Sequence, residues 1–369
     1  MRAVAALLSL LALLGGCGSK TAPRLVVGVV EDAAKIDPGP ELRRTKESGF
    51  AAVALSAVWS RGQRSPPPDL LGPLQAAAAT AQRDGIRPVV ALYQFSSQTP
   101  LSAGDRADFA AYAAALVQGL PQLHDLVVGN EPNLNLFWLP QFGPGGGDAA
   151  ASSFEALLAT TYDAVKAVRP DVEVIGAGLS PHGSDDPAAA RATHSPTRFL
   201  LDLAAAYRAS QRDRPIMDAL SIHPYGESPR IPPARAHPHS TSIGIADYAK
   251  LVDLLGRAFD GTAQPGRTLP IVYGEYGVET AIPPAKERLY HGRELVPAVD
   301  EAAQSRDYTA AIALAACQPT VSMLLLFHLE DEPRLEGLQS GVRYADGTPK
   351  SSEAQVARAA ADPRCRTSG

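Results

Sequence analysis

Leu126-Val127-Val128-Gly129-Asn130-Glu131-Pro132-Asn133 combines a short apolar strand pattern with a carboxylate at its end. Three branched apolar residues in a row favour a buried strand. The proline takes the chain off the strand directly after Glu131, so we expect this side chain to stand at the strand's carboxyl end. A partly buried glutamate in a pocket would suit a general acid. The alternative is a surface glutamate that opens the next helix.

Similar apolar runs recur on both sides of this stretch, and each is followed by a loop and a segment of helical periodicity. The predicted strands are 25–30, 52–55, 87–92, 126–128, 173–177, 219–222, 271–273 and 323–327. The predicted helices are 40–48, 69–84, 105–118, 152–168, 197–212, 245–259, 301–317 and 351–360. Continuous apolar strands separated by helices indicate a parallel sheet that is buried on both faces. Eight regular units favour an α/β fold of the closed (β/α)8 TIM barrel type over an open, doubly wound sheet, and we place this barrel at residues 25–361.

Composition is that of a soluble globular protein, with 45% hydrophobic and 20% charged residues in 369. The formal net charge is −5, and no cluster of Lys and Arg stands out. A nucleic-acid partner would need such a basic surface, so we expect none. We further expect a monomer.

The N-terminus has the pattern of a processing signal. An apolar run after Met1-Arg2 is too short to span a bilayer but fits the core of a signal peptide, here residues 1–16. The run ends in Leu14-Gly15-Gly16-Cys17, which resembles a bacterial lipobox. That resemblance implies cleavage before Cys17, lipidation of this cysteine and a tether over residues 17–24. An ordinary secretory signal is the alternative. In either case we expect export, with the lipid placing the protein at the cell surface or the periplasmic face of a membrane.

Export would permit a disulfide between the two remaining cysteines, Cys317 and Cys365. Two cysteines do not define a framework, so free thiols are an equal alternative. Residues 362–369 are expected to form a C-terminal tail.

His237-Pro238-His239 lacks a third ligand at a useful spacing, so we expect no metal and no other cofactor. A serine hydrolase has little support because the sequence has no G-x-S-x-G elbow.

A second glutamate repeats the strand-end arrangement. Ile271-Val272-Tyr273-Gly274-Glu275-Tyr276-Gly277 places Glu275 near two glycines, which would let backbone and ligand approach closely. Active sites of barrels lie at the carboxyl ends of the strands. The loops after strands four, six and seven hold Asn130, Glu131, His223, Tyr225 and Glu275. Cleavage of a glycosidic bond needs two carboxyl groups that face each other across that bond, and this pair meets the requirement.

These motifs resemble the clan A glycoside hydrolases, and the similarity is greatest to the cellulase-like family 5 and to family 39. Asn130-Glu131-Pro132, His223-x-Tyr225 and Glu275 carry the resemblance most specifically. Weaker support comes from residues 49–53, 317–319, 339–341 and 346–350. The resemblance implies a retaining mechanism with Glu131 as acid/base and Glu275 as nucleophile. It also implies that Asn130 bonds a sugar 2-hydroxyl, that Tyr225 holds the nucleophile in place and that His223 lines the cleft.

The sequence departs from the family 5 pattern at three places. Ala54 stands where an arginine is usual, Tyr93-Gln94 where a histidine is usual, and Phe327-His328 where a tryptophan is usual. The platform for the sugar therefore differs from that of a cellulase, while the glutamate pair is unaffected.

Three aromatic residues follow strands two and four, where a ring would stack on a sugar. We expect Trp59 and Trp138 to bind substrate in this way, with core packing as an equal alternative, and Phe137 with less support. Glu330-Asp331-Glu332 follows the last strand, and its pattern favours an exposed acidic turn over contacts with sugar hydroxyls.

The sequence thus predicts a glycosidase that hydrolyses O-glycosyl bonds in an extracellular polysaccharide or oligosaccharide. Two alternatives remain open. A carbohydrate-binding barrel without activity would be expected to lose one glutamate, and a transglycosylase would use the same residues.

Overall fold

The computed structural model describes residues 24–365. The predicted signal peptide, Cys17 and all of the tether except Arg24 lie outside the described residues, as do the last four residues of the tail. Nothing in the structure therefore bears on lipidation. The part of the chain that is described contains no helix with the length and apolar character needed to cross a membrane.

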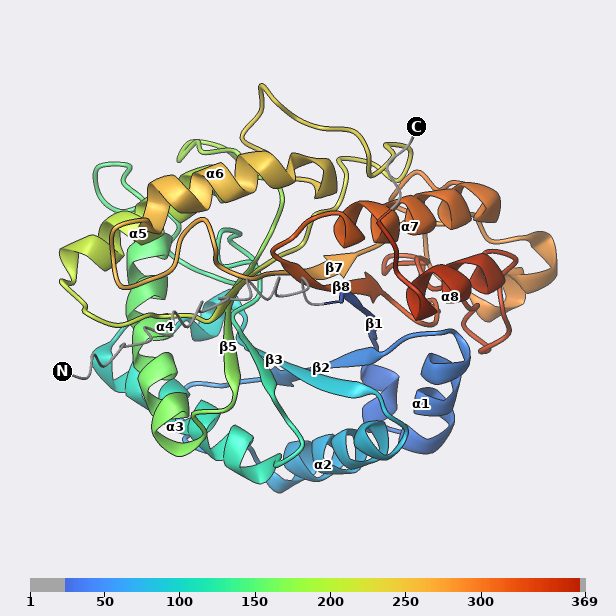
Figure 1. The fold of residues 1–369 in the computed structure, drawn as a ribbon, viewed down its shortest axis with the longest axis horizontal. Helices are drawn as coiled ribbons and strands as arrows, with labels where there is room; N and C mark the ends of the chain where they lie inside the picture. The colour runs from blue at the N-terminus through green and yellow to red at the C-terminus, as the bar shows by residue number, and fades with distance from the viewer. Residues whose placement is uncertain (1–23, 366–369) are drawn as a thin grey trace, which may run out of the picture.

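Eight parallel strands close into a barrel in the order of the sequence, as Figure 1 shows. The strands are β1 (Val26–Val30), β2 (Ala52–Val58), β3 (Arg87–Tyr93), β4 (Asp125–Val128), β5 (Glu173–Leu179), β6 (Ala219–Ile222), β7 (Ile271–Tyr276) and β8 (Val321–Phe327). The pairing of β1 with β8 closes the sheet, with Val26 opposite Met323. The predicted (β/α)8 barrel is confirmed, and every predicted strand is present.

Helices surround the barrel on its outside (Figure 1). They are α1 (Pro38–Glu47), α2 (Pro68–Arg83), α3 (Ala103–Gly119), α4 (Ala149–Val168), α5 (Pro196–Ala209), α6 (Tyr248–Phe259), α7 (Glu301–Ala316) and α8 (Glu353–Ala361). Short 3-10 helices are η1 (Asp32–Lys35), η2 (Ser96–Gln98), η3 (Ile245–Asp247) and η4 (Pro284–Leu289). Helices α1 to α7 each return the chain towards the start of the next strand, and α8 follows the last strand.

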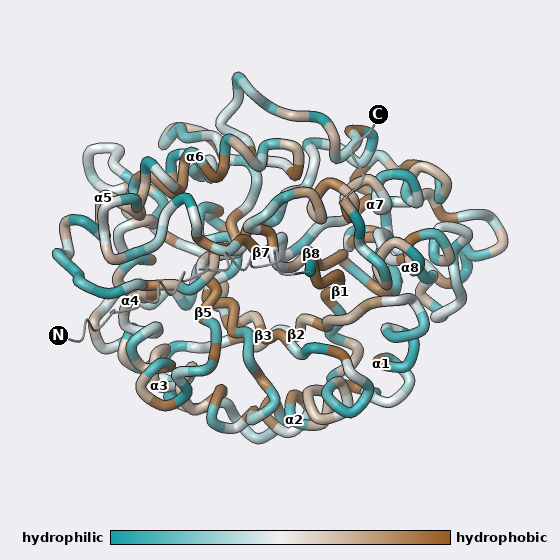
Figure 2. Tube along the Cα trace, in the orientation of Figure 1, coloured by the Kyte–Doolittle hydropathy of each residue, from teal (hydrophilic) through white to brown (hydrophobic). Residues whose placement is uncertain are grey.

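The core has two parts because side chains alternate across each strand. Inside the barrel lies a small cluster dominated by Ala and Val, which includes Ala54, Val127 and Leu325. The larger cluster fills the layer between strands and helices. Figure 2 shows this distribution, with hydrophobic residues along the strands and hydrophilic residues towards the outside. Small side chains at the top of the barrel leave space for a pocket at its mouth.

One predicted helix boundary is wrong in an informative way. The sequence favoured a helix start at Ser152, but α4 begins at Ala149 with the Asp148 carboxylate accepting the Ala151 N–H at 2.7 Å. The Ser152 and Ser153 hydroxyls instead donate to the Ala149 carbonyl. Serine bonds equally well to either end of a helical turn, so its presence did not identify the cap.

The disulfide joins Cys317 to Cys365, with Cα atoms 4.5 Å apart. It connects the end of α7 to the segment after α8 and closes a loop with a sequence separation of 48. In the chain-entropy model such a loop contributes roughly 3–4 kcal/mol to the free energy of unfolding.

Candidate active site

Glu131 stands at the end of β4 in a conformation that few residues adopt. Its φ is 42°, in the left-handed region, and its backbone N–H donates to the Gly178 carbonyl at 2.8 Å. Gly129, two residues earlier, has φ of 94°, and a Cβ there would lie 2.8 Å from the Phe154 ring. Strain of this kind persists only where the surroundings enforce it, and it concentrates at functional sites. The backbone is therefore shaped to present this carboxylate at the mouth.

Glu275 is the last but one residue of β7, and the absence of a side chain at the neighbouring Gly274 leaves room for other protein atoms. A Cβ at Gly274 would lie 2.4 Å from the Ser221 hydroxyl and 3.2 Å from the His223 ring. A Cβ at Gly277 would lie 2.9 Å from the Phe327 carbonyl. The expected close approach at these glycines is present, and the atoms that approach belong to neighbouring strands and to the histidine that faces Glu275. The approach of a ligand to them stays a prediction.

His223 connects the two glutamates. Its Nδ1 atom lies 3.2 Å from Oε1 of Glu131 and 3.5 Å from Oε2 of Glu275. Two oxygens that share one nitrogen in this way are within about 7 Å of each other, which brings the carboxyl groups to the separation at which a pair can act on one bond. Burial opposes the charged ring, but the two carboxylates outweigh it and raise the pKa of His223. The family resemblance implied only that His223 lines the cleft, and its contact with both glutamates was not predicted.

Tyr225 holds Glu275, as the resemblance implied. The phenol donates a hydrogen bond to Oε2 of Glu275 at 3.1 Å. Burial raises the pKa of Glu275, whereas His223 and the Tyr225 hydrogen bond act to lower it. The Tyr225 hydrogen bond thus favours the ionised form of Glu275, but burial has the larger influence on its pKa.

The two glutamates line a pocket of about 500 Å³ at the barrel mouth. Asn130, which comes two residues after the end of β4, also lines it. The floor is apolar and is formed by Ala54, Ala91, Val127 and Leu325. The described residues that line this pocket include no Lys or Arg. An apolar floor with carboxylates above it suits a neutral ligand that carries hydroxyl groups.

One side of this pocket is polar and follows β8 and β1. We call Asp32, His328 and Glu332 the polar side. His328 Nδ1 lies 2.9 Å from the Val30 carbonyl, which only accepts, so this nitrogen carries a proton. Its Nε2 lies 3.1 Å from Oε1 of Glu332. The hydrogen bond from His328 lowers the pKa of Glu332, and this contact raises the pKa of His328 against the effect of burial.

The acidic segment after β8 differs from the predicted exposed turn. Asp331 is buried and forms an ion pair with Lys350, Oδ1 to Nζ at 2.7 Å. Glu332 lines the pocket. Asp32 was missed as well, although it comes two residues after β1. The strand-end test that identified Glu131 would have found Asp32 if it had been applied to the first strand.

The opposite side of the pocket is apolar. Phe95 follows β3, and Leu136 and Phe137 follow β4. The rings of Phe95 and Phe137 stack with centroids 5.8 Å apart and planes at 21°. The less favoured aromatic of the sequence analysis, Phe137, is therefore the one that reaches the pocket.

No family model matches the sequence, and the search of curated proteins finds no relative. Solved structures do match. A family 39 glycoside hydrolase from Bacteroides cellulosilyticus WH2 is 17% identical with a TM-score of 0.64, and the match covers 92% of this chain and 64% of that one. A GH5_18 protein from Bifidobacterium longum subsp. infantis is 15% identical with a TM-score of 0.60, and the match covers 93% and 80% of the two chains. The chain shares the (β/α)8 barrel fold of these two proteins.

A monomeric beta-xylosidase from Caulobacter crescentus CB15 has the same glycoside hydrolase barrel, with 15% identity, a TM-score of 0.56 and coverage of 91% and 67%. The predicted resemblance to clan A glycoside hydrolases is confirmed at the level of the barrel fold by these neighbours. Identities this low establish the fold and not the reaction. This chain spans just under two thirds of the family 39 protein, so that protein's activity is not transferred to it.

The two tryptophans do not line the pocket at the barrel mouth, and the stacking predicted for them is wrong. Both are fully buried in the layer between strands and helices. Trp59 packs edge-on against Phe109 and donates to the Gln63 carbonyl at 2.8 Å, while Trp138 donates to the Ser153 hydroxyl at 2.9 Å. The core-packing alternative is correct for each.

The histidines of the 237–239 segment take part in protein contacts. His237 Nδ1 lies 2.7 Å from Oδ2 of Asp247 and its Nε2 lies 3.3 Å from Glu227. Within residues 24–365, no group of three His, Cys, Asp or Glu side chains is arranged to hold a metal ion. The expectation of no metal stays a prediction.

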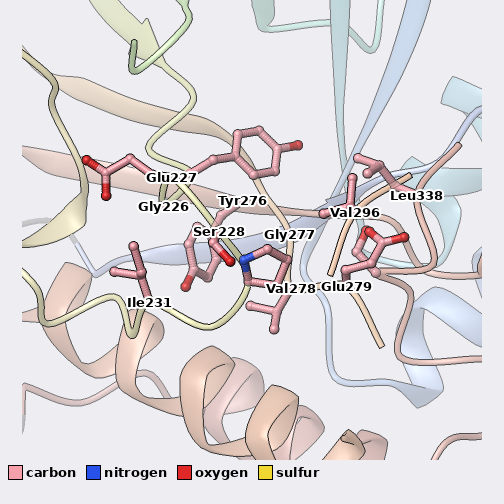
Figure 3. Close-up of a pocket in the computed structure, with 13 residues that line it drawn as sticks. Gly226, Glu227, Ser228, Ile231, Tyr276, Gly277, Val278, Glu279, Val296 and Leu338 are labelled. Atoms are coloured by element: carbon pink, nitrogen blue, oxygen red, sulfur yellow. The ribbon is translucent and has the colours of Figure 1, made fainter. Parts of the chain in front are cut away.

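A second, smaller cavity of about 140 Å³ lies behind Tyr225 in the same mouth, and Figure 3 shows its lining. Loops after β6, β7 and β8 form it, with Glu227, Tyr276 and Glu279 among its residues. Glu279 is buried, and its Oε1 accepts the Gln339 backbone N–H at 2.8 Å. Burial raises the pKa of Glu279 to about 7. The sequence analysis did not single out this glutamate.

Proposed function

We propose that this protein is a retaining O-glycosyl hydrolase with Glu131 as acid/base and Glu275 as nucleophile. One observation carries the proposal: two strand-end glutamates lie against the same histidine nitrogen, in one pocket, on a glycoside hydrolase barrel. A surface role for either glutamate would not explain this convergence, nor the left-handed backbone of Glu131.

The roles follow from what each carboxyl group contacts. Tyr225 fixes Oε2 of Glu275, so its other oxygen is available to attack the anomeric carbon. Glu131 gives its proton to the departing oxygen and then takes a proton from the water that releases the sugar. A retaining pair requires carboxyl groups roughly 5–5.5 Å apart. The shared contact with His223 is compatible with that separation.

The sugar is neutral in this proposal. No lysine or arginine lines the described pocket, although Lys35 pairs with Asp32 from outside the lining. Asp32, which also accepts the Ser56 N–H, and Glu332 offer carboxylate oxygens to the hydroxyl groups of a sugar. Solved neighbours include an exo-beta-1,4-mannosidase from an Opitutaceae bacterium and a beta-xylosidase, which are examples of the substrate class we infer. We further propose that the chain acts outside the cytoplasm, held at a membrane through lipid on Cys17.

A panel of aryl glycosides, oligosaccharides and polysaccharides tests the function. We expect at least one neutral glycoside to be cleaved, and the first product seen by proton NMR to keep the anomeric configuration of the substrate. Glu275→Gln should abolish the reaction, and Glu287→Gln, an exposed glutamate after β7, should leave it unchanged. Inversion of configuration would refute the retaining assignment. A complete lack of turnover across the panel would favour the carbohydrate-binding alternative, and transfer of sugar to acceptors in place of water would favour a transglycosylase.

A further inference from the structure

An apolar surface at the barrel mouth adjoins the catalytic pocket. We call Phe95, Leu101, Leu136, Phe137 and Leu139 the apolar wall. Three of its members, Phe95, Leu136 and Phe137, line the pocket. Four of its side chains are unusually exposed: Phe95 at 46%, Leu101 at 46%, Leu136 at 58% and Leu139 at 45%. Exposed apolar side chains that gather in one place mark a binding surface, whereas scattered ones need no explanation.

Backbone hydrogen bonds hold the apolar wall in place. The Ser96 N–H donates to the Leu136 carbonyl at 3.0 Å, and the Gln94 side chain donates to the Phe137 carbonyl at 3.2 Å. The Leu139 N–H donates to the Thr99 hydroxyl at 3.1 Å. The loops after β3 and β4 are thus joined along their length. A surface that is fixed before the ligand arrives binds it at a smaller entropic cost.

The apolar wall lies on the side of the proposed acid. Leu136 and Phe137 follow Glu131 in the same loop, where the Leu134 N–H donates to the Glu131 carbonyl at 2.8 Å. Glu131 must contact the oxygen of the departing group in order to protonate it. The departing group therefore starts at Glu131, and the wall follows Glu131 in the same loop and lines the same pocket. The sugar that reacts with Glu275 has the polar side on the opposite part of the barrel.

A sugar is a poor occupant for the apolar wall. Its hydroxyl groups would lose water without gaining hydrogen bonds from leucine and phenylalanine side chains, which is unfavourable. Aromatic rings alone would suit the face of a sugar, but Leu136, the most exposed member of the wall at 58%, lines the pocket together with Phe95 and Phe137. An alkyl or aryl group loses nothing polar there and gains apolar contact.

We propose that the group released by this enzyme is an apolar aglycone, alkyl or aryl in character, bound by the apolar wall. The inference rests on the proposed glycosidase function and narrows its substrate class from polysaccharide to glycosides of apolar alcohols. The first catalytic step exchanges one bond at the anomeric carbon for another. The Glu275 carboxylate forms the bond to the anomeric carbon, and the aglycone oxygen leaves with its electron pair and takes the proton of Glu131.

Two glycosides whose aglycone chains differ by only one atom in length test the proposal, both made with the sugar that the substrate panel identifies. One carries a hexyl group and the other a 2-(2-methoxyethoxy)ethyl group. The ether alcohol is the better leaving group, so chemistry alone would favour the polar substrate. We expect kcat/KM to be higher for the hexyl glycoside by about tenfold or more, as for other apolar contacts in enzyme pockets.

Variants assign that preference to the wall. Leu136→Gln and Phe95→Gln should each reduce the hexyl-to-ether ratio of kcat/KM severalfold. Leu201→Gln, at an exposed leucine on α5, is the matched control and should keep the ratio of the native enzyme. A ratio near one, or a ratio that both wall variants preserve, overturns the inference while the glycosidase function stands. If no sugar of the panel is cleaved, the proposed function fails and this inference fails with it.

Discussion

The two sides of the catalytic pocket are built from the same kind of element, the loop at the carboxyl end of a strand, but they differ in chemistry. The polar side, after β8 and β1, consists of Asp32, His328 and Glu332. The apolar wall follows β3 and β4. In the closed barrel, β4 lies across from β8, whereas β2 alone separates β3 from β1. The scissile bond would lie between the two sides of the pocket, with hydroxyl groups on one side and hydrocarbon on the other.

The two sides also differ in how they are anchored. The apolar wall is held by hydrogen bonds between neighbouring loops, whereas the polar side depends on a buried charge. Next to Glu332, Asp331 pairs with Lys350, and neither side chain is exposed. Removal of one partner from a buried pair typically costs about 3–5 kcal/mol because the other charge is left uncompensated. A buried charge fixes a loop strongly only while its partner is present.

Of all the substitutions, that of the proposed nucleophile Glu275 should reduce kcat the most. Glu275→Gln keeps the shape of the side chain but cannot form the glycosyl ester. We expect kcat to fall on the order of 10⁵–10⁶-fold, as on loss of other nucleophiles, for both apolar and polar aglycones. Steady-state kinetics on the hexyl and ether glycosides measures this. Residual activity above about one per cent would mean that another residue forms the intermediate.

Glu131→Gln should discriminate between leaving groups. Loss of acid assistance should slow alkyl glycosides about 10²–10⁴-fold. A dinitrophenyl glycoside needs no proton on its leaving group, so its first step should be nearly unaffected, and azide should restore turnover as a nucleophile that needs no base. Pre-steady-state kinetics separates the two steps. Equal losses for both leaving groups would contradict the acid role.

On the polar side, Glu332→Gln should weaken binding of the sugar and not of the aglycone. A hydrogen bond between a charged group and a hydroxyl is worth about 1.5–3 kcal/mol, so we expect kcat/KM to fall roughly tenfold to 100-fold. The hexyl-to-ether ratio should stay that of the native enzyme, which is the opposite of the Leu136→Gln result. Glu336→Gln, an exposed glutamate in the same loop, is the control. A change in the hexyl-to-ether ratio would contradict the assignment of the sugar to the polar side and the aglycone to the apolar wall.

The smallest effect concerns stability and its dependence on pH. The pKa of Glu279 is about 7 in the folded protein against an ordinary value of 4.5, so the folded state holds its proton more tightly than the unfolded state. The free energy of unfolding therefore falls as pH rises from about 4.5 to 7. Glu279→Gln removes this loss and should be more stable than the native protein at pH 8, by on the order of 2–3 kcal/mol, with little difference at pH 4.5.

Urea unfolding at both pH values checks the Glu279 prediction. The amide oxygen of the variant still accepts the Gln339 N–H, so a stability change at low pH would point to packing and not to charge.

The sequence alone was sufficient for the barrel because its strands are continuous apolar runs, a pattern that depends on neighbouring residues only. Strand ends were less predictable. β2, β5 and β7 each extend beyond their predicted ends, to Val58, Leu179 and Tyr276, because Ser and Gly near these ends interrupt the apolar pattern. These residues line or shape the pocket, so function itself obscures the local signal.

The site was predictable where position along a strand decides orientation, as for Glu131 and Glu275. It was not predictable in the loops, where consecutive residues point in different directions. Phe137 faces the pocket while Trp138, the next residue, is buried against α4. The partners that decide this, Ser153 and Phe154, are not apparent from the sequence of the loop.

The most direct test of the catalytic pair is a covalent trap. A 2-deoxy-2-fluoro glycoside with a dinitrophenyl leaving group should react with the Glu275 carboxylate, release dinitrophenolate and leave the sugar on the protein, because the fluorine slows the second step. Peptide mass spectrometry should then place the sugar on Glu275 alone, with one equivalent of dinitrophenolate released in a burst. A label on Glu131 or on any other residue, or turnover without an adduct, would contradict the account.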